Sequence, residues 1–237
     1  MSTFFAFREL PSWQLYYKMI KMETNTNSKQ LKKFAILFAT FVVPLLFFLF
    51  LASGKVNFNK LPVLTERVQN IPARTDVSLY NKVSVVSVVG STSSVDAYQK
   101  VLNLYQVVYK YAAKYEKFQI VTLVPDTDKT IIDKLQKELA LVGGESLDKW
   151  HFVVLSVSEI DTIVNSFESK ATYDLEEGIS EVFVVDEQLN LRGRTDDEDT
   201  ESGVLFGYNA GEVAVLKNKL RDDLDVVFYE SIYAVKE

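Results

Sequence analysis

The chain contains no cysteine and only one histidine, His151, among its 237 residues. Without cysteine it can form no disulfide, thiolate metal site, thiol nucleophile or lipid thioether. Any Ser-His pair or histidine metal site would have to be built around His151. The composition therefore excludes thiol chemistry and leaves little room for histidine-dependent catalysis.

Charged residues are missing from one long stretch, Phe34 to Ala52, in which only Thr40 and Pro44 interrupt the apolar run. As a helix, these nineteen residues would measure about 28 Å, close to the ~30 Å hydrocarbon core of a bilayer. Membrane helices tolerate proline. A cleaved signal peptide is the alternative, but its apolar region is usually shorter, and no A-x-A-like cleavage site follows. The stretch predicts one uncleaved transmembrane helix at 34–52.

The charges beside this stretch predict its orientation. Six cations and two acids precede it, a net charge of +4, whereas only Lys55 and Lys60 follow closely. The positive-inside rule then places the N-terminus in the cytoplasm and the domain after Ser53 on the periplasmic side of the cytoplasmic (inner) membrane. The residues after 33 carry twenty cations and thirty acids. An acidic domain has no electrostatic reason to bind nucleic acid, so the sequence predicts no nucleic-acid partner.

Two segments flank the predicted span. Residues 1–33 show no clear periodicity and are expected to form a cytoplasmic tail. Two interpretations of this tail stay open: translation starts at Met19 or Met22, or the aromatic residues near Trp13 form a short interfacial helix. Residues 53–81 contain two prolines and no sustained pattern. They are predicted to form an extended tether that lifts the domain off the bilayer.

Residues 82–237 alternate strand and helix patterns. Apolar, β-branched runs predict strands, and two such runs separated by a short polar turn predict a hairpin. Apolar residues at helical spacing predict helices. The expected strands are 82–90, 118–124, 151–157, 181–186 and 189–194. The expected helices are 96–115, 129–142, 158–167 and 213–227, the last of them capped by residues 209–212. The third helix is expected to open with a capping box at Ser158 and Asp161. Right-handed crossovers make the first three strands largely parallel. The predicted fold class is α/β, a thioredoxin-like sheet with flanking helices after one transmembrane helix.

Several short motifs in this order make residues 60–230 resemble the SCO/SenC family. The family consists of membrane-anchored, thioredoxin-like copper chaperones of cytochrome c oxidase assembly. The matching motifs are Val124-Pro-Asp-Thr-Asp128, Lys149-Trp-His-Phe152, Val182-Phe-Val-Val-Asp186, Leu191-Arg-Gly-Arg-Thr-Asp196 and Lys219-Leu-Arg-Asp-Asp223. The resemblance implies the fold and a partnership in oxidase assembly.

The metal ligands implied by the resemblance are absent from this chain. The family holds copper with a C-x-x-x-C loop after the first core strand and one histidine before the hairpin. The loop positions are here Gly90, Ser91, Thr92, Ser93 and Ser94, and the histidine position falls near Gly178. Copper(I) needs thiolate, thioether or imidazole, none of which these residues supply. We therefore expect a degenerate ligand loop with no metal, no cofactor and no catalytic residue.

Other candidate sites have plainer interpretations. The 90–94 loop either binds an anion at a helix N-terminus or is a simple connection and cap. His151 is expected to be structural. The acidic run 196–201 lacks the glycine and spacing of an EF-hand, so it is expected to be a solvated loop. The tyrosines of the first domain helix are expected to pack in the core or to form a contact face; they are Tyr98, Tyr105, Tyr109 and Tyr115.

The sequence thus predicts a non-catalytic, membrane-anchored accessory protein. It would act by contact in respiratory-oxidase assembly, with oxidase subunits or a cysteine-containing SCO relative as partners. The alternative is a module that binds a small ligand, or a metal through oxygen ligands, in the degenerate cleft.

Overall fold

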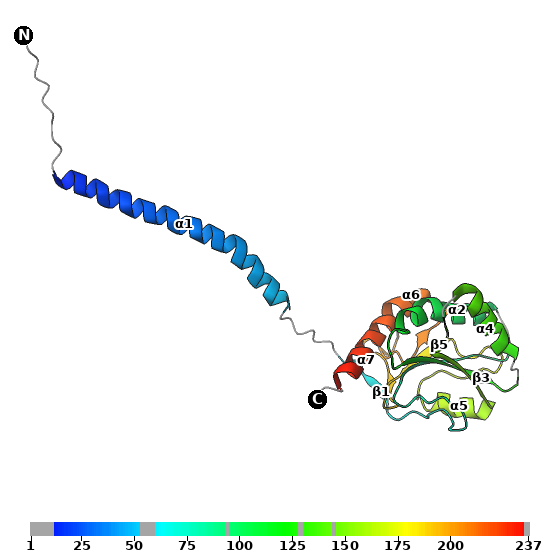
Figure 1. Cartoon of the computed structure of the whole chain (residues 1–237). Coiled ribbons are helices and arrows are strands. Elements are labelled where there is room, and N and C mark those ends of the chain that lie inside the picture. Colours follow the sequence, from blue (N-terminus) through cyan, green and yellow to red (C-terminus); the bar gives the residue numbers. More distant parts are fainter. Residues whose placement is uncertain (1–11, 53–59, 93–94, 128–129, 144–145, 235–237) are drawn as a thin grey trace, which may run out of the picture. The chain divides into compact units, whose positions relative to one another are not determined.

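The computed structural model describes residues 12–52, 60–92, 95–127, 130–143 and 146–234 (Figure 1). The chain divides into two compact units, Met1–Asn57 and Phe58–Glu237. Each unit is described by itself.

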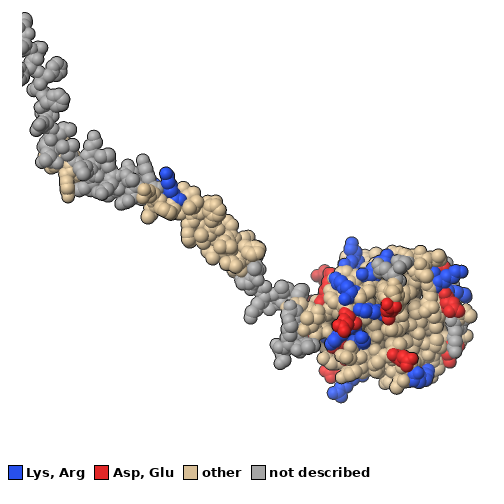
Figure 2. Space-filling view, viewed as in Figure 1, with Lys and Arg blue, Asp and Glu red and all other residues tan. Residues whose placement is uncertain are grey.

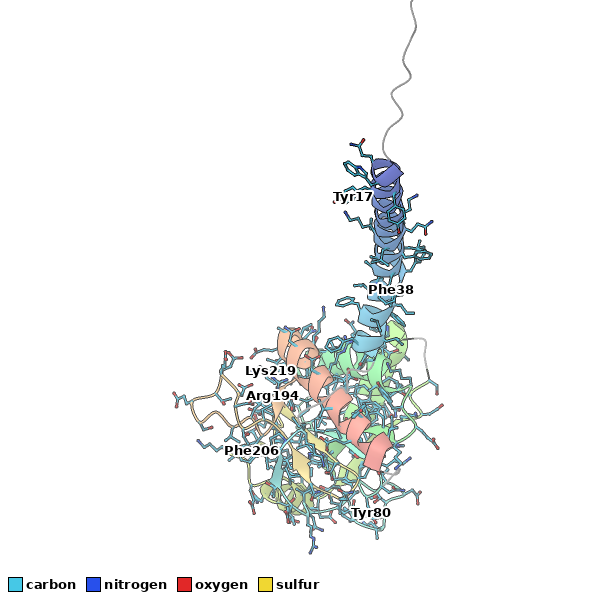
Figure 3. The ribbon with its side chains drawn as sticks, turned by 90° about the vertical axis from the view of Figure 1, so that its left-hand side faces the viewer. Tyr17, Phe38, Tyr80, Arg194, Phe206 and Lys219 are labelled. Atoms are coloured by element: carbon cyan, nitrogen blue, oxygen red, sulfur yellow. The ribbon has the colours of Figure 1, made fainter. Side chains whose placement is uncertain are left out.

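In the described part of the first unit, residues 12–52 form a single helix, α1 (Ser12–Ala52). It is long and apolar enough at Gln30–Phe50 to cross a membrane. Figure 2 shows no charged side chains on the C-terminal part of α1, residues 34–52, and Figure 3 shows Tyr17 and Phe38 projecting outward from the helix. α1 curves along its second half (Figure 1), where Pro44 offers no N–H to the carbonyl of Thr40.

The predicted boundary between a tail at 1–33 and a span at 34–52 is not a helix boundary. α1 begins at Ser12 and runs through both segments without a break. The residues from Ser12 to Lys33 include no glycine or proline, so a helix that is established in the apolar stretch can extend backward through them. Met19 and Met22 both lie inside this helix, and residues 1–11 lie outside the described part of the chain.

The second unit is built on a seven-stranded mixed sheet with the order β1-β6-β5-β2-β3-β4, and β7 pairs with β5. As predicted, β2, β3 and β4 are parallel, and β5 runs antiparallel to β2. The strands are β1 (Val63–Thr65), β2 (Val83–Val88), β3 (Phe118–Pro125), β4 (Trp150–Leu155), β5 (Glu181–Val185), β6 (Leu191–Arg192) and β7 (Tyr208–Asn209).

Helices cover both faces of the sheet, with α2, α4, α6 and α7 on one side and α5 on the other (Figure 1). Two of them contain a π-helical segment: α2 continues through η1 into α3, and α6 continues through η2 into α7. The bounds are α2 (Val95–Asn103), η1 (Leu104–Tyr109), α3 (Lys110–Ala112), α4 (Thr130–Gly143), α5 (Val157–Asn165), α6 (Val213–Val215), η2 (Leu216–Leu220) and α7 (Arg221–Ala234).

Strand alternation divides the core into two clusters. Val83 and Val85 of β2 face the helices α2, α4 and α7, whereas Val86 and Val88 face α5. Both sets of side chains are at most 2% exposed. A central strand buried on both faces explains the continuous apolar run that predicted it.

The expected tether at 53–81 is wrong for its larger part. Leu61, Val68, Ile71 and Leu79 are buried, and β1 pairs with β6 at the edge of the sheet. These apolar residues have no regular spacing, so no local pattern marked them, yet burying them against the sheet is favourable. The folded unit therefore includes residues predicted to lie outside the 82–237 domain.

Of two predicted helix starts, one is confirmed and the other lies two residues earlier. The last helix begins at Val213, directly after the predicted cap at 209–212, although Asn209 itself belongs to β7. The capping box lies at Ser156 and Glu159, two residues before the expected pair. β4 ends at Leu155, so the polar residue that leaves the strand first becomes the cap.

Candidate functional site

The residues predicted as a degenerate ligand loop lie at the C-terminal end of β2. Gly90 and Ser91 follow this strand after Val89, and Gly178 lies beside them although it is far away in the sequence. Val89 and Gly178 form an isolated β-bridge, and the Ile179 N–H donates to the Val88 carbonyl at 3.0 Å. The structure therefore brings Gly90, Ser91 and Thr92 together with Gly178, while Ser93 and Ser94 lie outside the described residues.

We call residues 174–178 the strap. Its turn is closed by Asp174, whose Oδ1 accepts from the N–H groups of Glu176 and Glu177 at 2.8 Å each. The Gly178 N–H donates to the Asp174 carbonyl at 2.8 Å. Gly178 has a φ of +77°, a conformation that favours glycine. The strap is thus a tight turn fixed by its own hydrogen bonds.

The strap touches the end of β2 backbone to backbone. A Cβ on Gly90 would lie 2.1 Å from the Glu176 carbonyl oxygen, and a Cβ on Gly178 would lie 2.5 Å from the Val88 carbonyl oxygen. No side chain fits at either position without a shift of the backbone. A histidine at 178 would therefore need a different strap.

The loop donors are already used. The Ser91 N–H donates to the Leu175 carbonyl at 2.7 Å, and the Thr92 N–H donates to the Glu176 carbonyl at 3.1 Å. An anion site on the loop would need free N–H groups. These two cannot serve it while the strap is in place, which favours the simple-connection interpretation for the described half of the loop.

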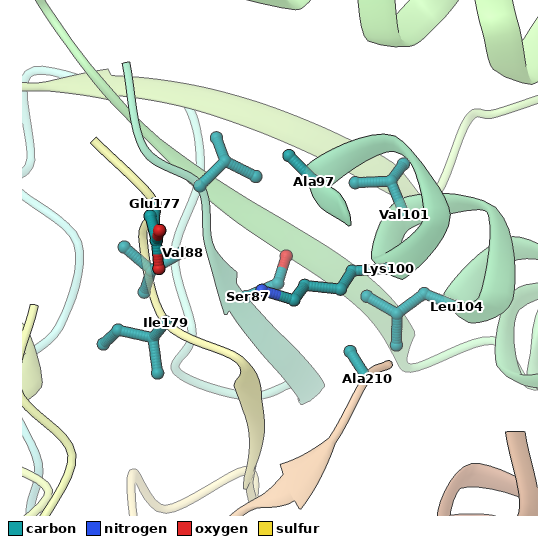
Figure 4. A pocket seen from close by; sticks show the side chains of 10 residues that line it. Ser87, Val88, Ala97, Lys100, Val101, Leu104, Glu177, Ile179 and Ala210 are labelled. Carbon is teal, nitrogen blue, oxygen red and sulfur yellow. The ribbon is translucent and has the colours of Figure 1, made fainter. Parts of the chain in front are cut away.

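A small pocket lies beside the strap, between β2 and α2 (Figure 4). Lys100 extends from α2 across it toward Ser87, and Glu177 and Ile179 line the opposite side. The Lys100 side chain is 13% exposed and forms an ion pair with Asp96. The interior volume is about 10 Å³, at the lower limit for one water molecule. The pocket as it stands has no room for a larger ligand.

A buried polar chain beneath the pocket was not predicted. The hydroxyls of Ser87 and Thr122 are 2.8 Å apart, and the Trp150 indole N–H donates to Thr122 at 2.9 Å. These residues lie on neighbouring parallel strands β2, β3 and β4. Their mutual hydrogen bonds offset the cost of burying them, so the arrangement stabilises the core. Their proximity depends on strand register, which the sequence does not reveal.

The four tyrosines have different environments. Tyr105 and Tyr109 are buried and stacked, with ring centroids 5.8 Å apart, and therefore cannot form a contact face. Tyr115 is half-buried and stacks on Phe228 at 4.0 Å. Tyr98 is half-buried against the same core. An interface role for Tyr98 and Tyr115 stays a prediction.

A fifth tyrosine, Tyr111, lies in a cluster that connects α3 with α7. Its hydroxyl donates to Asp225 at 2.6 Å, and the Arg221 guanidinium lies 3.9 Å from its ring centroid. Partial burial and the Asp225 carboxylate raise the pKa of Tyr111. Lys114 lies over the same ring at 4.5 Å. The cluster joins two helices and leaves the Tyr111 phenol protonated at neutral pH.

His151 and the acidic run have structural surroundings. His151 lies in β4, and burial together with Lys82 lowers its pKa. Asp197, in the acidic run, is buried and pairs with Lys219 at 2.6 Å, so the run is only partly a solvated loop. Figure 3 places Arg194 beside Lys219, whose carbonyl accepts a hydrogen bond from it at 3.3 Å. Among the described residues, no three Asp, Glu or His side chains converge as a metal site.

Three solved structures are similar to this chain. BsSco, a member of the Sco family of cytochrome c oxidase assembly proteins with a disulfide switch, matches with a TM-score of 0.50 and 17% identity over 72% of this chain and 98% of its own. A SCO1/SenC family lipoprotein from Bacillus anthracis str. Ames has a TM-score of 0.48 and 14% identity over 71% of this chain and 98% of its own. Copper-bound ScoI from Arabidopsis thaliana has a TM-score of 0.42 and 12% identity over 63% of this chain and 89% of its own.

No family model and no curated protein matches the sequence. The likeness to BsSco extends over nearly all of that protein, and it concerns the arrangement of strands and helices. The globular unit of this chain therefore has the thioredoxin-like fold of a Sco family protein, attached to a helix that is long enough to span a membrane.

Proposed function

We propose that this chain is a Sco-like protein that acts by contact, without metal or thiol chemistry, as an accessory factor in respiratory-oxidase assembly. The fold of BsSco and the candidate membrane helix support the general assignment. The apolar stretch and the cations before it support a single-pass anchor in the cytoplasmic membrane, with the globular unit on the periplasmic side.

One observation carries the non-metal part of this proposal. The chain has no cysteine, and the strap occupies the end of β2 so closely that neither Gly90 nor Gly178 has room for a Cβ. Copper(I) requires sulfur or imidazole ligands, and the nearby groups are hydroxyls, carboxylates and backbone. Loss of the ligands is therefore matched by a packed backbone at the same place. A contact function needs only the surface around this place.

The alternative function, a small-ligand or oxygen-ligand metal module, would need the pocket beside the strap. Its volume of about 10 Å³ is too small for an organic ligand. Lys100 brings a positive charge into it, which opposes the binding of a metal cation. The contact function is therefore the better supported of the two.

A copper(I) titration of the purified full-length chain in detergent tests the first part. A competing chelator of known affinity should retain the copper at all protein concentrations. The matched variant His151→Gln should behave identically, because the single imidazole is not expected to be a ligand. Stoichiometric binding that outcompetes the chelator would overturn the proposal.

Photo-crosslinking in membranes tests the second part. A photoreactive residue at Leu175, which is 40% exposed on the strap, should capture oxidase subunits or a cysteine-containing Sco relative. The same residue at Leu141, which is 73% exposed at the end of α4, serves as the control position. Capture from both positions alike, or from neither, would contradict a contact surface around the strap.

A further inference from the structure

The sheet of the second unit has two edges, and they differ in how well they are protected. At the β1 edge the strand is three residues long, its pairing with β6 is irregular between Val63 and Thr65, and Pro62 precedes it. Short length, irregular pairing and proline all hinder pairing with a further strand. β4, at the opposite edge, is six residues long and pairs with β3 in regular register throughout.

The composition of β4 also lacks the residues that usually block an edge. Its sequence, Trp-His-Phe-Val-Val-Leu, contains no proline, glycine, lysine, arginine or acid. Its one titratable side chain is that of His151, and burial together with Lys82 lowers the pKa of this histidine. The imidazole is therefore mostly uncharged at neutral pH. A regular, uncharged, apolar edge strand is the kind to which another strand adds.

The backbone groups available for pairing belong to Phe152 and Val154. In a parallel pair, alternate residues bond to the neighbouring strand. The Ile120 N–H of β3 donates to the Lys149 carbonyl at 2.8 Å, so the odd-numbered residues of β4 bond to β3. The N–H and C=O groups of Phe152 and Val154 therefore point to the other side of β4, where no strand lies among the described residues.

The residues at the two ends of the strand add no further donor on that side. The Trp150 N–H donates to the Leu147 carbonyl at 2.9 Å. The Ser156 N–H donates to the Glu159 carboxylate, also at 2.9 Å. A further strand would thus find its donors at the two outward-facing residues between them.

A second, antiparallel copy of β4 satisfies all of these groups. When the two copies are centred on Val153, Phe152 of each lies opposite Val154 of the other. Each such pair exchanges both of its N–H···O=C bonds, as hydrogen-bonded pairs do in antiparallel sheets. No N–H or C=O group of Phe152 or Val154 is then left over. The same patch meets itself, which gives a closed twofold interface.

The charges at the ends of β4 favour the antiparallel direction. Lys82 lies close enough to His151, near the start of the strand, to lower its pKa. The exposed Asp126 lies at the other end, where its N–H donates to the Leu155 carbonyl at 2.9 Å. Antiparallel pairing brings the basic end of one copy to the acidic end of the other, whereas parallel pairing would place like charges together.

We propose that β4 is a dimerisation edge, to which a second copy of this chain adds its own β4 in antiparallel register centred on Val153. The inference goes beyond the proposed function and does not rest on it, because every contact that supports it lies within the second unit. The strap follows β2, which β3 separates from β4, so the two surfaces are distinct.

Sedimentation equilibrium of the full-length chain, in a detergent whose density the solvent matches, tests the dimer. The native chain should be dimeric at the highest soluble concentration and should dissociate on dilution. Val154→Pro should be monomeric, because proline removes an outward N–H and its ring fills the place of the partner strand. The bonds to β3 belong to other residues, so this variant should still unfold cooperatively. Val154→Lys, which places a charge at the edge, should also be monomeric.

Leu141→Lys is the matched control. It adds the same charge to a side chain that is 73% exposed at the end of α4, and it should dimerise like the native chain. A native chain that is monomeric at every concentration would overturn the proposal. Dimers of native affinity in Val154→Pro and Val154→Lys would also overturn it, because the contact would then lie elsewhere in the chain.

Amide hydrogen exchange, followed by NMR on the same samples, identifies the edge itself. The Phe152 N–H points to solvent in a single copy and is hydrogen-bonded in the dimer, so its exchange should be at least about tenfold faster in Val154→Pro than in the native chain. The Val153 N–H, which faces β3, should exchange slowly in both. Equal Phe152 exchange in both chains would overturn the β4 pairing. Failure of the Leu175 crosslinks would instead contradict the contact function and leave this result unchanged.

Discussion

Replacing Gly178 with alanine should destabilise the globular unit strongly, because two separate costs meet at this residue. The first is its φ of +77°, which an L side chain rarely adopts. That conformation costs about 1–2 kcal/mol for a residue with a Cβ. The second is contact: the new Cβ would lie 2.5 Å from the Val88 oxygen and 2.6 Å from the Gly90 nitrogen.

Neither neighbouring atom can give way alone, since both belong to the backbone at the end of β2. Forcing extra volume into packed structure typically costs about 1–3 kcal/mol. The two costs together give about 2–5 kcal/mol for Gly178→Ala. For a unit of this size that corresponds to a fall in melting temperature of about 4–20 °C.

Two further glycine variants separate the costs. Gly203 has a similar φ of +71°, but its Cβ would meet only the Thr195 oxygen at an ordinary 3.5 Å. Gly203→Ala should therefore lose about 1–2 kcal/mol from its backbone conformation alone. Gly90→Ala has only the contact cost, with the Glu176 oxygen at 2.1 Å. The lower entropy of the unfolded alanine chain is common to all three variants and cancels in the comparison.

Urea unfolding of the full-length chain in mild detergent, followed by Trp150 fluorescence in a Trp13→Phe background, measures the three losses. Trp150 is 5% exposed in the globular unit, so its emission reports that unit. The expected order of destabilisation places Gly178→Ala and Gly90→Ala above Gly203→Ala. If Gly178→Ala costs no more than Gly203→Ala, the strap does not press on β2 and the packed-site argument fails.

Three smaller predictions concern titratable groups and one buried hydroxyl. The ion pair with Arg74 and the capping hydrogen bonds lower the pKa of Glu159 to about 2. The ionised carboxylate therefore contributes fully to stability above its ordinary pKa of 4.5, and this contribution is lost as the pH falls toward 2. In Glu159→Gln the melting temperature should change less with pH between these two values. Tyr208→Phe removes a 2.6 Å hydrogen bond to Asp223 and should cost about 1.5–3 kcal/mol in urea unfolding, and a loss below about 0.5 kcal/mol would contradict the bond. Burial and Lys82 lower the pKa of His151, so the midpoint of its NMR titration should lie below the ordinary value of 6.5. Because the folded state favours the neutral imidazole, the free energy of unfolding should rise with pH just below 6.5. A midpoint above 6.5 would refute this.

Local patterns were sufficient for the scaffold. The strands β2, β3 and β4 could be predicted from their β-branched runs, because a strand buried on both faces is apolar almost throughout. A helix over 34–52 could also be predicted from its apolar residues, although the helix begins much earlier, at Ser12. A helix extends through polar residues because each new turn builds on the turn beside it, and this cooperativity leaves no sign in the charge or hydropathy of those residues.

Segments that depend on distant partners were mispredicted or missed. Leu61 and Val68 were predicted to lie in a tether because their apolar side chains are irregularly spaced. Both are buried in the folded unit, and Arg192 holds the Leu61 carbonyl. Tyr105 and Tyr109 offered both a core and an interface interpretation. The packing around η1 decided for the core.

The sequence by itself determined that thiol chemistry is excluded, since no fold can supply the missing cysteines. It also determined the apolar helix and the succession of β2 to β6 along the chain, which are properties of neighbouring residues. Only the tertiary structure decided that Gly90 and Gly178 meet backbone to backbone and that the chain is held at Leu61. The physical reason is that contacts across more than eighty residues depend on register and close packing, which leave no periodic mark on the chain.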